Sequence, residues 1–227
     1  MKQRSSRGFR ADKYLLTSKY IRERTGSAAD SIRQSGIDPT SALLDSIAAY
    51  TELLLRWNRK LNLTTITEPA EIVSRNFAES FLAARWLSAS DGVLWDVGSG
   101  AGFPGLALKL ILPRWRVHLV EPSTKKCAFL SEAARTLSFS DVHVERSSWQ
   151  TADVAEHSVN TITSRAMGGH AELADWASLV LLPIGNLILW VGADEAENLS
   201  RLPGWTWERL PVPGSKERVI LRGVVRR

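Results

Sequence analysis

The residues with the clearest chemical potential lie in one glycine-rich segment, which runs from Asp96 to Gly105. The segment reads Asp-Val-Gly-Ser-Gly-Ala-Gly-Phe-Pro-Gly, and the short apolar run Val93–Val97 leads into it. Glycines at the carboxyl end of a parallel strand let a ligand approach the backbone closely. We therefore expect Gly98 and Gly100 to line a crevice that holds a nucleotide-like cofactor.

The glycine spacing leaves two cofactor classes open. The dinucleotide fingerprint is Gly-x-Gly-x-x-Gly, and the last three of the four glycines fit it loosely. Asp96 favours S-adenosylmethionine, because an acid two positions before the first glycine is poorly placed for pyrophosphate but can face a positively charged amino and sulfonium group. Glu121 follows the first glycine by 23 residues, where a carboxylate can accept both ribose hydroxyls of either cofactor.

Strands and helices alternate around this loop, and their hydrophobic periodicity predicts their positions. Such alternation predicts an α/β fold with a mostly parallel sheet covered on both faces. The last two strands have no helix between them and are expected to form an antiparallel hairpin at the sheet edge. The predicted strands are Val93–Val97, Val117–Val120, Val142–Val144, Thr161–Ser164, Asn186–Val191, Trp205–Leu210 and Arg218–Val225, and the predicted helices are Leu43–Trp57, Ala70–Leu87, Gly105–Leu112, Thr124–Leu137 and Ala171–Leu182.

Charge divides the chain of 227 residues unevenly. The net charge is +5, from 29 Lys and Arg against 24 Asp and Glu, and residues 1–40 hold nine of the bases and four of the acids. The rest is therefore formally neutral. We expect a basic arm over 1–40, of which residues 1–30 are disordered or helical only on a partner, a helical part over 41–90, and a cofactor-binding domain over 91–227. The arm would bind RNA phosphates, although a solvated tail remains the alternative.

Several classes of protein are disfavoured by composition. One cysteine, Cys127, cannot form an intramolecular disulfide, and the four histidines have no metal-ligand spacing. No apolar run reaches the roughly 18 residues of a membrane span, and no signal peptide is apparent. We therefore expect a cytoplasmic protein without a metal. We also expect a monomer, although composition does not bear on the oligomeric state.

Five motifs in order resemble a known family, the bacterial guanine-N7 methyltransferases of small-subunit ribosomal RNA, also called glucose-inhibited division protein B. The resemblance implies a seven-stranded, Rossmann-like methyltransferase fold with N-terminal helices and a C-terminal antiparallel hairpin. It also implies S-adenosylmethionine as cofactor and 16S rRNA or the 30S subunit as partner. The motifs are Trp57-Asn58, Asn62-Leu63-Thr64, Asp96 to Gly105, Lys125-Lys126 with Phe129-Leu130, and Ser164-Arg165-Ala166.

Site residues follow from the chain and from the resemblance together. For Asn62 and Thr64 two roles are equally open, namely contact with the substrate and stabilisation of a turn. The expected cofactor-binding residues are Asp96, Gly98, Gly100, Phe103, Glu121, Ser147, Ser148 and Arg165, and the expected substrate-binding residues are Asn62, Thr64 and Arg165.

Three positions depart from the family pattern. Asn76 stands where the family has His, in an element that reads Asn-Phe-Ala-Glu-Ser instead of His-x-x-Asp-Ser. Ser148 stands where an acid can meet the adenine amino group, and Val191 replaces a Lys at the end of the fifth strand. The missing His and Lys weaken substrate binding more than the transfer step, whereas Ser148 makes recognition of the adenine looser. Trp149 and Trp190, near the expected crevice, are the tryptophans best placed to stack on bases.

Methylation of guanine N7 needs little from the protein beyond position. The nitrogen already carries an exposed lone pair, so no catalytic general base is required. We thus expect a methyltransferase acting on 16S rRNA. The alternatives are a divergent methyltransferase acting on another RNA or a small molecule, and a catalytically silent, cofactor-binding RNA-binding module. An NAD-dependent oxidoreductase is disfavoured by Asp96.

Overall fold

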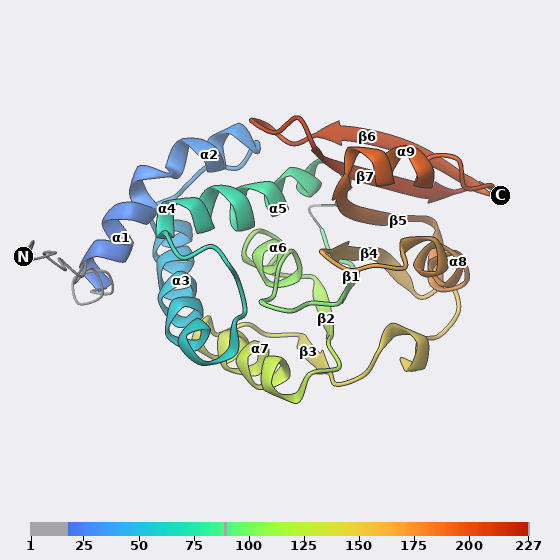
Figure 1. The fold of residues 1–227 in the computed structure, drawn as a ribbon. Helices are drawn as coiled ribbons and strands as arrows, with labels where there is room; N and C mark the ends of the chain where they lie inside the picture. Colours follow the sequence, from blue (N-terminus) through green and yellow to red (C-terminus); the bar gives the residue numbers. More distant parts are fainter. Residues whose placement is uncertain (1–17, 89, 227) are drawn as a thin grey trace, which may run out of the picture.

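A seven-stranded sheet forms the centre of the computed structural model, which describes residues 18–88 and 90–226 (Figure 1). The strands are β1 Val93–Val97, β2 Arg116–Val120, β3 Val142–Glu145, β4 Val159–Arg165, β5 Leu181–Gly192, β6 Trp205–Pro211 and β7 Arg218–Val225. Their spatial order is β3-β2-β1-β4-β5-β7-β6. The first five strands run parallel, and β7 lies antiparallel between β5 and β6.

This topology confirms the predicted fold class. Val, Ile and Leu are the commonest residues of the central strands β1, β4 and β5, most of whose residues are buried on both faces as expected for parallel strands covered by helices. Only β5 differs markedly from the prediction, because it begins at Leu181 and includes Pro183 and Gly185. A register shift in its pairing with β4 accommodates this early segment.

Helices precede the sheet and connect its strands. Thr40 caps the start of α3, because its side-chain oxygen accepts a hydrogen bond from the Leu43 amide at 3.2 Å. The expected single helix over Ala70–Leu87 instead consists of four short elements of different winding. The helical elements are α1 Ser18–Ser27, α2 Ala29–Gln34, α3 Ser41–Leu61, α4 Pro69–Ile72, the π-helix η1 Val73–Ala78, α5 Glu79–Phe81, the 3₁₀ helix η2 Leu82–Trp86, α6 Gly105–Ile111, α7 Thr124–Thr136, the 3₁₀ turn η3 Trp149–Thr151, α8 His170–Val180 and α9 Ala193–Leu199.

Two hydrophobic cores lie on opposite faces of the sheet. Side chains alternate along β1, so Leu94 joins the core under α1 to α7, whereas Trp95 and Val97 join the core under α8 and α9. In Figure 1, α1 and α3 lie at the left and β6 at the upper right, while the loop between β6 and β7 reaches toward α2. The carboxyl ends of the neighbouring parallel strands β1, β4 and β5 lie at the same edge of the sheet. Ligands bind at this edge in open α/β sheets.

The N-terminal arm is folded over residues 18–34. Ile21 and Ile32 are fully buried, and α1 packs against α3 and α4 while α2 packs against η1. The expectation of an arm that is disordered or helical only on a partner is therefore wrong for residues 18–30, because two isoleucines secure this part of the chain to the core. Residues 1–17, which hold the rest of the arm, lie outside the described residues. No described helix has both the length and the apolar character needed to cross a membrane.

Candidate functional site

The loop after β1 owes its shape to three alternate glycines. Gly98, Gly100 and Gly102 have φ values of 71°, 53° and 80°, a region that side chains other than glycine adopt only at a cost. The amides of Gly98 and Ser99 donate to the carbonyl of Val120 at the end of β2, at 2.9 and 3.2 Å. The loop is thereby fixed across the carboxyl ends of two neighbouring strands.

An aromatic cluster ties this loop to the N-terminal helices. Tyr50 of α3 is fully buried, and its hydroxyl donates to the carbonyl of Ala101 at 2.7 Å. Its ring stacks on Phe103 at 5.3 Å between centroids, and Phe77 meets both rings edge-on. The helical part before the sheet therefore positions the glycine loop directly.

Asp96 lies beneath the loop and not on the surface of the cleft. Its side chain is fully buried, and Oδ1 accepts from the Thr163 hydroxyl at 2.8 Å. Oδ2 has no hydrogen-bond partner among the described residues and lies so close to Gly105 that a Cβ there would come within 2.7 Å. Burial raises the pKa of Asp96 to about 6, against the lowering effect of the Thr163 hydrogen bond. The buried Asp96 carboxylate is therefore placed to support the glycine loop from beneath and not to contact a ligand in the cleft.

Glu121, at the end of β2, is bonded to the loop. Its Oε2 accepts from the Gly100 amide at 3.0 Å, and its Oε1 accepts from the Ser123 amide at 2.9 Å. Lys126 Nζ lies 3.9 Å from Oε2. Because each carboxylate oxygen has two acceptor positions, Glu121 keeps capacity for a further donor while it holds the loop.

A cleft of about 360 Å³ opens beside the glycine loop. This volume falls in the range of about 300–1,000 Å³ that is typical of small-molecule sites. Gly98, Gly100 and Phe103 line it as expected, together with Thr64 and Arg165. The structure thus brings five of the predicted site residues around one cavity, whose other lining residues are Leu63, Thr65, Ile66, Arg75, Asn76, Ser99, Ala101, Lys126 and Ala166.

The wall opposite the glycine loop is the segment that follows α3. Asn58 fixes it, because its amide nitrogen donates to the Thr64 carbonyl at 2.8 Å and its Oδ1 accepts from the Thr64 amide at 2.9 Å. Asn62 is exposed and ends α3 in a left-handed conformation, with a φ of 48°. Thr64 therefore faces the cleft, whereas Asn62 is outside its lining and shapes the turn.

The two serines after β3 also lie outside the lining of the cleft. Ser148 pairs with the hydroxyl of Thr151 at 3.2 Å, and the Ser147 amide donates to the carbonyl of Glu145 at 2.9 Å. A direct cofactor contact of these serines stays a prediction. Trp149 packs on Trp176 of α8, with 5.8 Å between ring centroids.

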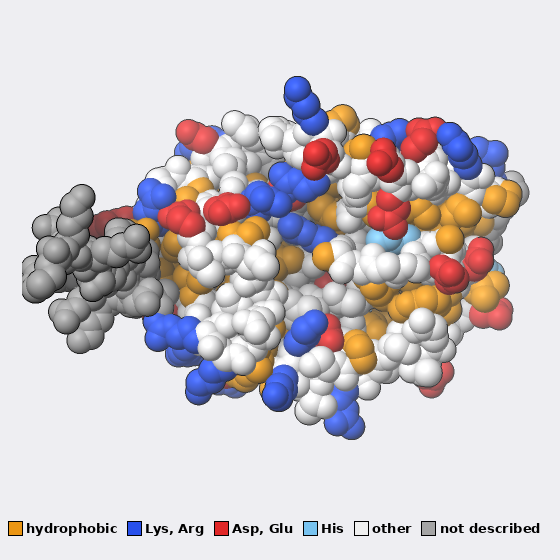
Figure 2. Space-filling view, viewed as in Figure 1, with side chains coloured by type: hydrophobic (Ala, Val, Ile, Leu, Met, Phe, Trp, Pro, Cys, Tyr) orange, Lys and Arg blue, Asp and Glu red, His pale blue; other side chains and the backbone are white. Residues whose placement is uncertain are grey.

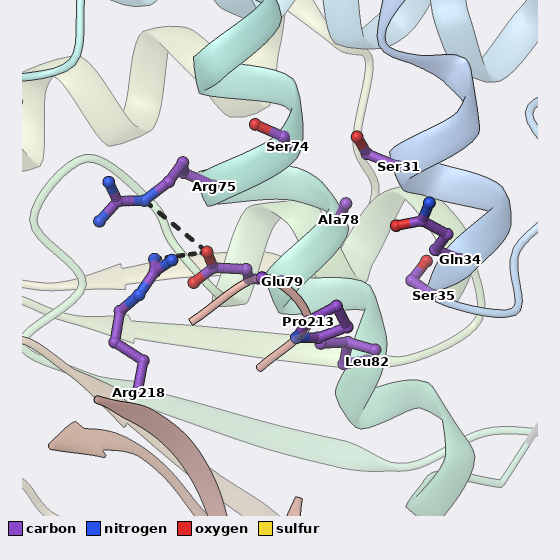
Figure 3. Close-up of a pocket in the computed structure, with 11 residues that line it drawn as sticks. Ser31, Gln34, Ser35, Ser74, Arg75, Ala78, Glu79, Leu82, Pro213 and Arg218 are labelled. Atoms are coloured by element: carbon purple, nitrogen blue, oxygen red, sulfur yellow. Dashed lines mark hydrogen bonds and ion pairs between the residues drawn. The ribbon is translucent and has the colours of Figure 1, made fainter. Parts of the chain in front are cut away.

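Three arginines surround one buried glutamate at the edge of the cleft. Arg218 of β7 lies 2.5 Å from Glu79, Arg75 lies 3.7 Å away and Arg165 lies 3.9 Å away. Figure 3 shows Arg75 and Arg218 pointing toward the Glu79 carboxylate from different elements. Burial lowers the pKa of Arg165, and the neighbouring arginines act in the same direction while Glu79 opposes them.

This arginine cluster, Arg75, Arg165 and Arg218 around Glu79, carries more positive than negative charge. Blue side chains of Lys and Arg gather near the centre of the face shown in Figure 2. Arg165 was predicted as a site residue and Glu79 was noted only as part of a departure from the family pattern, because Glu79 and Arg218 are 139 residues apart and no motif joins them. The π-helical turn η1, which carries Arg75 and Asn76 into the cleft wall, gave no signal in the hydrophobic periodicity either.

Within residues 18–88 and 90–226, no group of three or more His, Cys, Asp or Glu side chains is arranged to hold a metal ion.

Sequence comparison relates the chain to one family. A protein-family model described as rRNA small subunit methyltransferase G matches residues 43–204. A ribosomal RNA small subunit methyltransferase G from Halorhodospira halophila is 35% identical over 176 residues, covering 78% of this chain and 82% of the relative. Another from Xylella fastidiosa is 37% identical over 186 residues, covering 78% and 85%.

Structure comparison supports the same fold. A SAM-dependent methyltransferase from Aquifex aeolicus superposes with a TM-score of 0.59 at 14% identity, over 73% of this chain and 97% of that one. A tRNA (m1A58) methyltransferase from the same organism superposes with a TM-score of 0.54 at 11% identity, over 66% and 69%. These similarities show the fold of a Rossmann-like methyltransferase.

Proposed function

The chain belongs to the rRNA small subunit methyltransferase G family, and we propose that it transfers a methyl group from S-adenosylmethionine to N7 of a guanine in 16S rRNA. The observation that carries this proposal is the cleft between the glycine loop and the Thr64 segment, with the arginine cluster at its edge. It combines a place for a nucleoside cofactor with a positively charged approach for RNA.

The cleft fits the cofactor in size and in chemistry. Gly98 and Gly100 present backbone without side chains, and a Cβ on Gly98 would lie 3.3 Å from the Met167 sulfur. We assign the ribose to Glu121, whose carboxylate already holds the Gly100 amide and can accept further hydroxyl groups. S-adenosylmethionine, when bound, supplies a methyl group activated by its positively charged sulfur.

Asp96 serves this site from beneath. Its buried carboxylate lies under the loop with one oxygen unpaired, so it provides negative charge near the cleft without occupying it. We propose that this charge supports binding of a cationic cofactor, and that Ser147 and Ser148 contribute at the adenine end.

Orientation of the substrate falls to the residues around the cleft edge. A guanine N7 has a free lone pair, so the transfer needs no side chain that removes a proton. Thr64, in the segment after α3, and Arg165, at the end of β4, both line the cleft and are suited to orient the substrate. Phe103 and the aromatic cluster keep the glycine loop rigid. Arginine is suited to RNA phosphates because its guanidinium presents several donors in one plane.

The direct test is transfer of a tritiated methyl group onto three substrates: 30S subunits, free rRNA and total tRNA. We expect incorporation into rRNA or 30S subunits, and strong loss of it in Arg165→Ala. Arg201→Ala is a matched control, because Arg201 is exposed and pairs with Glu197 outside the cleft. Cofactor binding without transfer to any RNA would refute the proposal and favour a silent binding module.

We further propose that the protein acts in the cytoplasm as a monomer.

A further inference from the structure

A second cavity, of about 290 Å³, adjoins the cleft at the carboxyl ends of β4 and β5. Arg165 and Ala166 line both cavities, so the two spaces meet at these residues. A group seated in the second cavity would therefore lie next to whatever occupies the cleft. We call the second cavity the β5 pocket.

Apolar side chains from two neighbouring strands form the walls of the β5 pocket. Trp190 and Val191 of β5 line it together with Val219 of β7, which stands beside Val191 in the antiparallel register. The Trp190 indole is held in place, because its Nε1 donates to the Glu79 carbonyl at 3.1 Å. A flat aromatic group has rigid apolar surface to pack on here.

Charged groups reach the pocket from both sides of the sheet. On the side of α5, Arg165 and Arg218 are held by Glu79. On the side of α8 and α9, the His170 Nδ1 lies 2.6 Å from Glu195 Oε1. In Figure 2, red and orange side chains lie beside the central blue group toward α9.

The His170–Glu195 pair has capacity for a ligand. His170 is 3% exposed, and its Nε2 has no hydrogen-bond partner among the described residues. The Glu195 side chain is 45% exposed, and the imidazole uses only one of the roughly four acceptor positions of a carboxylate. Glu195 is thus fixed in position at one oxygen and open to donors at the other.

The four bases differ in what they offer such a carboxylate. Guanine alone presents two adjacent donors, N1–H and N2–H, on its Watson–Crick edge, while its acceptor N7 lies on the far side of the ring system. Glu195 lines the β5 pocket and not the cleft, whereas Arg165 lines both. A guanine whose donor edge meets Glu195 would turn N7 toward the cleft.

Resting on the proposed function, we propose that the β5 pocket is the site of the target guanosine nucleotide, in which Glu195 selects guanine by accepting from N1–H and N2–H. Trp190 and Val191 contact the base, and Arg165 and Arg218 bind its phosphate. His170 is a positioning residue that orients the Glu195 carboxylate. Val191, at a position where the family has a cation, is then part of the apolar wall.

The test compares binding of guanosine, inosine and adenosine 5′-monophosphates by NMR titration of the ¹⁵N-labelled protein, without RNA. Inosine lacks the N2 amino group and so loses one of the two contacts with Glu195. The test variant is Glu195→Gln, which keeps the shape of the side chain but replaces one acceptor by a donor. The matched control is Glu197→Gln, on the same helix, because Glu197 pairs with Arg201 and Arg209 outside the pocket.

We expect the wild-type protein and Glu197→Gln to bind the guanosine nucleotide about fivefold to tenfold more tightly than the inosine nucleotide. Glu195→Gln should bind the two within about twofold of each other, with the same unfolding midpoint as the control. An unchanged preference in Glu195→Gln would overturn the proposal. So would resonances of the β5 pocket that fail to shift with the guanosine nucleotide at millimolar concentration.

The wild-type transfer assay keeps this inference separate from the proposed function. Methyl transfer to rRNA with no preference for the guanosine nucleotide would refute the role of Glu195 alone. A guanosine preference that depends on Glu195, without transfer to any RNA, would instead retain the pocket and refute the methyltransferase activity.

Discussion

Gly102 provides a quantitative test of how the N-terminal helices hold the cofactor loop. A Cβ at this position would stand 2.1 Å from the Tyr50 hydroxyl oxygen and 2.8 Å from Leu106 Cδ1. In addition, its φ of 80° disfavours any side chain. We expect Gly102→Ala to force the Tyr50 hydroxyl away from the Ala101 carbonyl and to displace the loop.

Gly36 makes it possible to separate the two costs. Its φ is 87° and a Cβ there would meet nothing within 4 Å, so Gly36→Ala carries the backbone strain alone, about 1–2 kcal/mol. Gly102→Ala adds the lost Tyr50 hydrogen bond and the disturbed stacking on Phe103, for a total loss of about 3–5 kcal/mol in unfolding free energy.

Urea denaturation and calorimetric titration with S-adenosylmethionine measure both effects. We expect Gly102→Ala to weaken cofactor binding at least about tenfold, because each 1.4 kcal/mol of loop distortion costs that factor. Gly36→Ala should leave the affinity unchanged. Tyr50→Phe removes the clashing oxygen, so Gly102→Ala should cost at least about 1 kcal/mol less in that background. Equal costs for the two glycine variants, or no coupling with Tyr50, would refute the role given to the aromatic cluster.

Three other predictions test the surroundings of the loop. Burial raises the pKa of Asp96 to about 6, so the native state binds its proton more tightly than the unfolded chain, and the contribution of Asp96 to stability should fall as pH rises from about 4 to about 6. Asp96→Asn should remove that slope from urea denaturation curves, and an unchanged slope would contradict the burial argument. Glu121→Gln leaves the Gly100 or the Ser123 amide without its acceptor and should weaken cofactor binding in calorimetry by about 1–2 kcal/mol, whereas wild-type affinity would exclude a role in the site. Deleting residues 1–17, which hold five Lys or Arg and one Asp, should flatten the salt dependence of rRNA binding, and equal salt slopes with and without them would reduce the segment to a solvated tail. Deleting residues 1–40 should also destabilise the fold, because it removes the buried side chains of Ile21 and Ile32.

The sheet and the cofactor loop could be predicted because their signals are local. Short apolar runs mark the strands, and the glycines between Asp96 and Gly105 must lie where the backbone turns with positive φ. In each case the local structure is determined by residues that are neighbours in the sequence, so a local sequence pattern is sufficient to predict it.

Contacts between residues that lie far apart in the sequence could not be predicted from such local patterns. Glu79 meets Arg218 only because β7 inserts beside β5, which brings residues 139 positions apart into contact. The side of β1 on which Asp96 emerges depends on the strand's packing against α6, and this packing buries a carboxylate that was expected to face the cofactor. Similarly, the basic composition of the arm gave no indication that Ile21 and Ile32 are buried and hold the arm against the core.

The position of the methyl group on the RNA is the most direct test of the proposed activity. After incubation of 30S subunits or 16S rRNA with the protein and S-adenosylmethionine, reduction and aniline treatment cleave the RNA chain at N7-methylguanosine. We predict one new cleavage site in 16S rRNA, at a guanosine, which is absent without the cofactor and strongly reduced in Arg165→Ala. Methyl incorporation without chain cleavage, or cleavage in tRNA alone, would contradict N7 methylation of small-subunit rRNA.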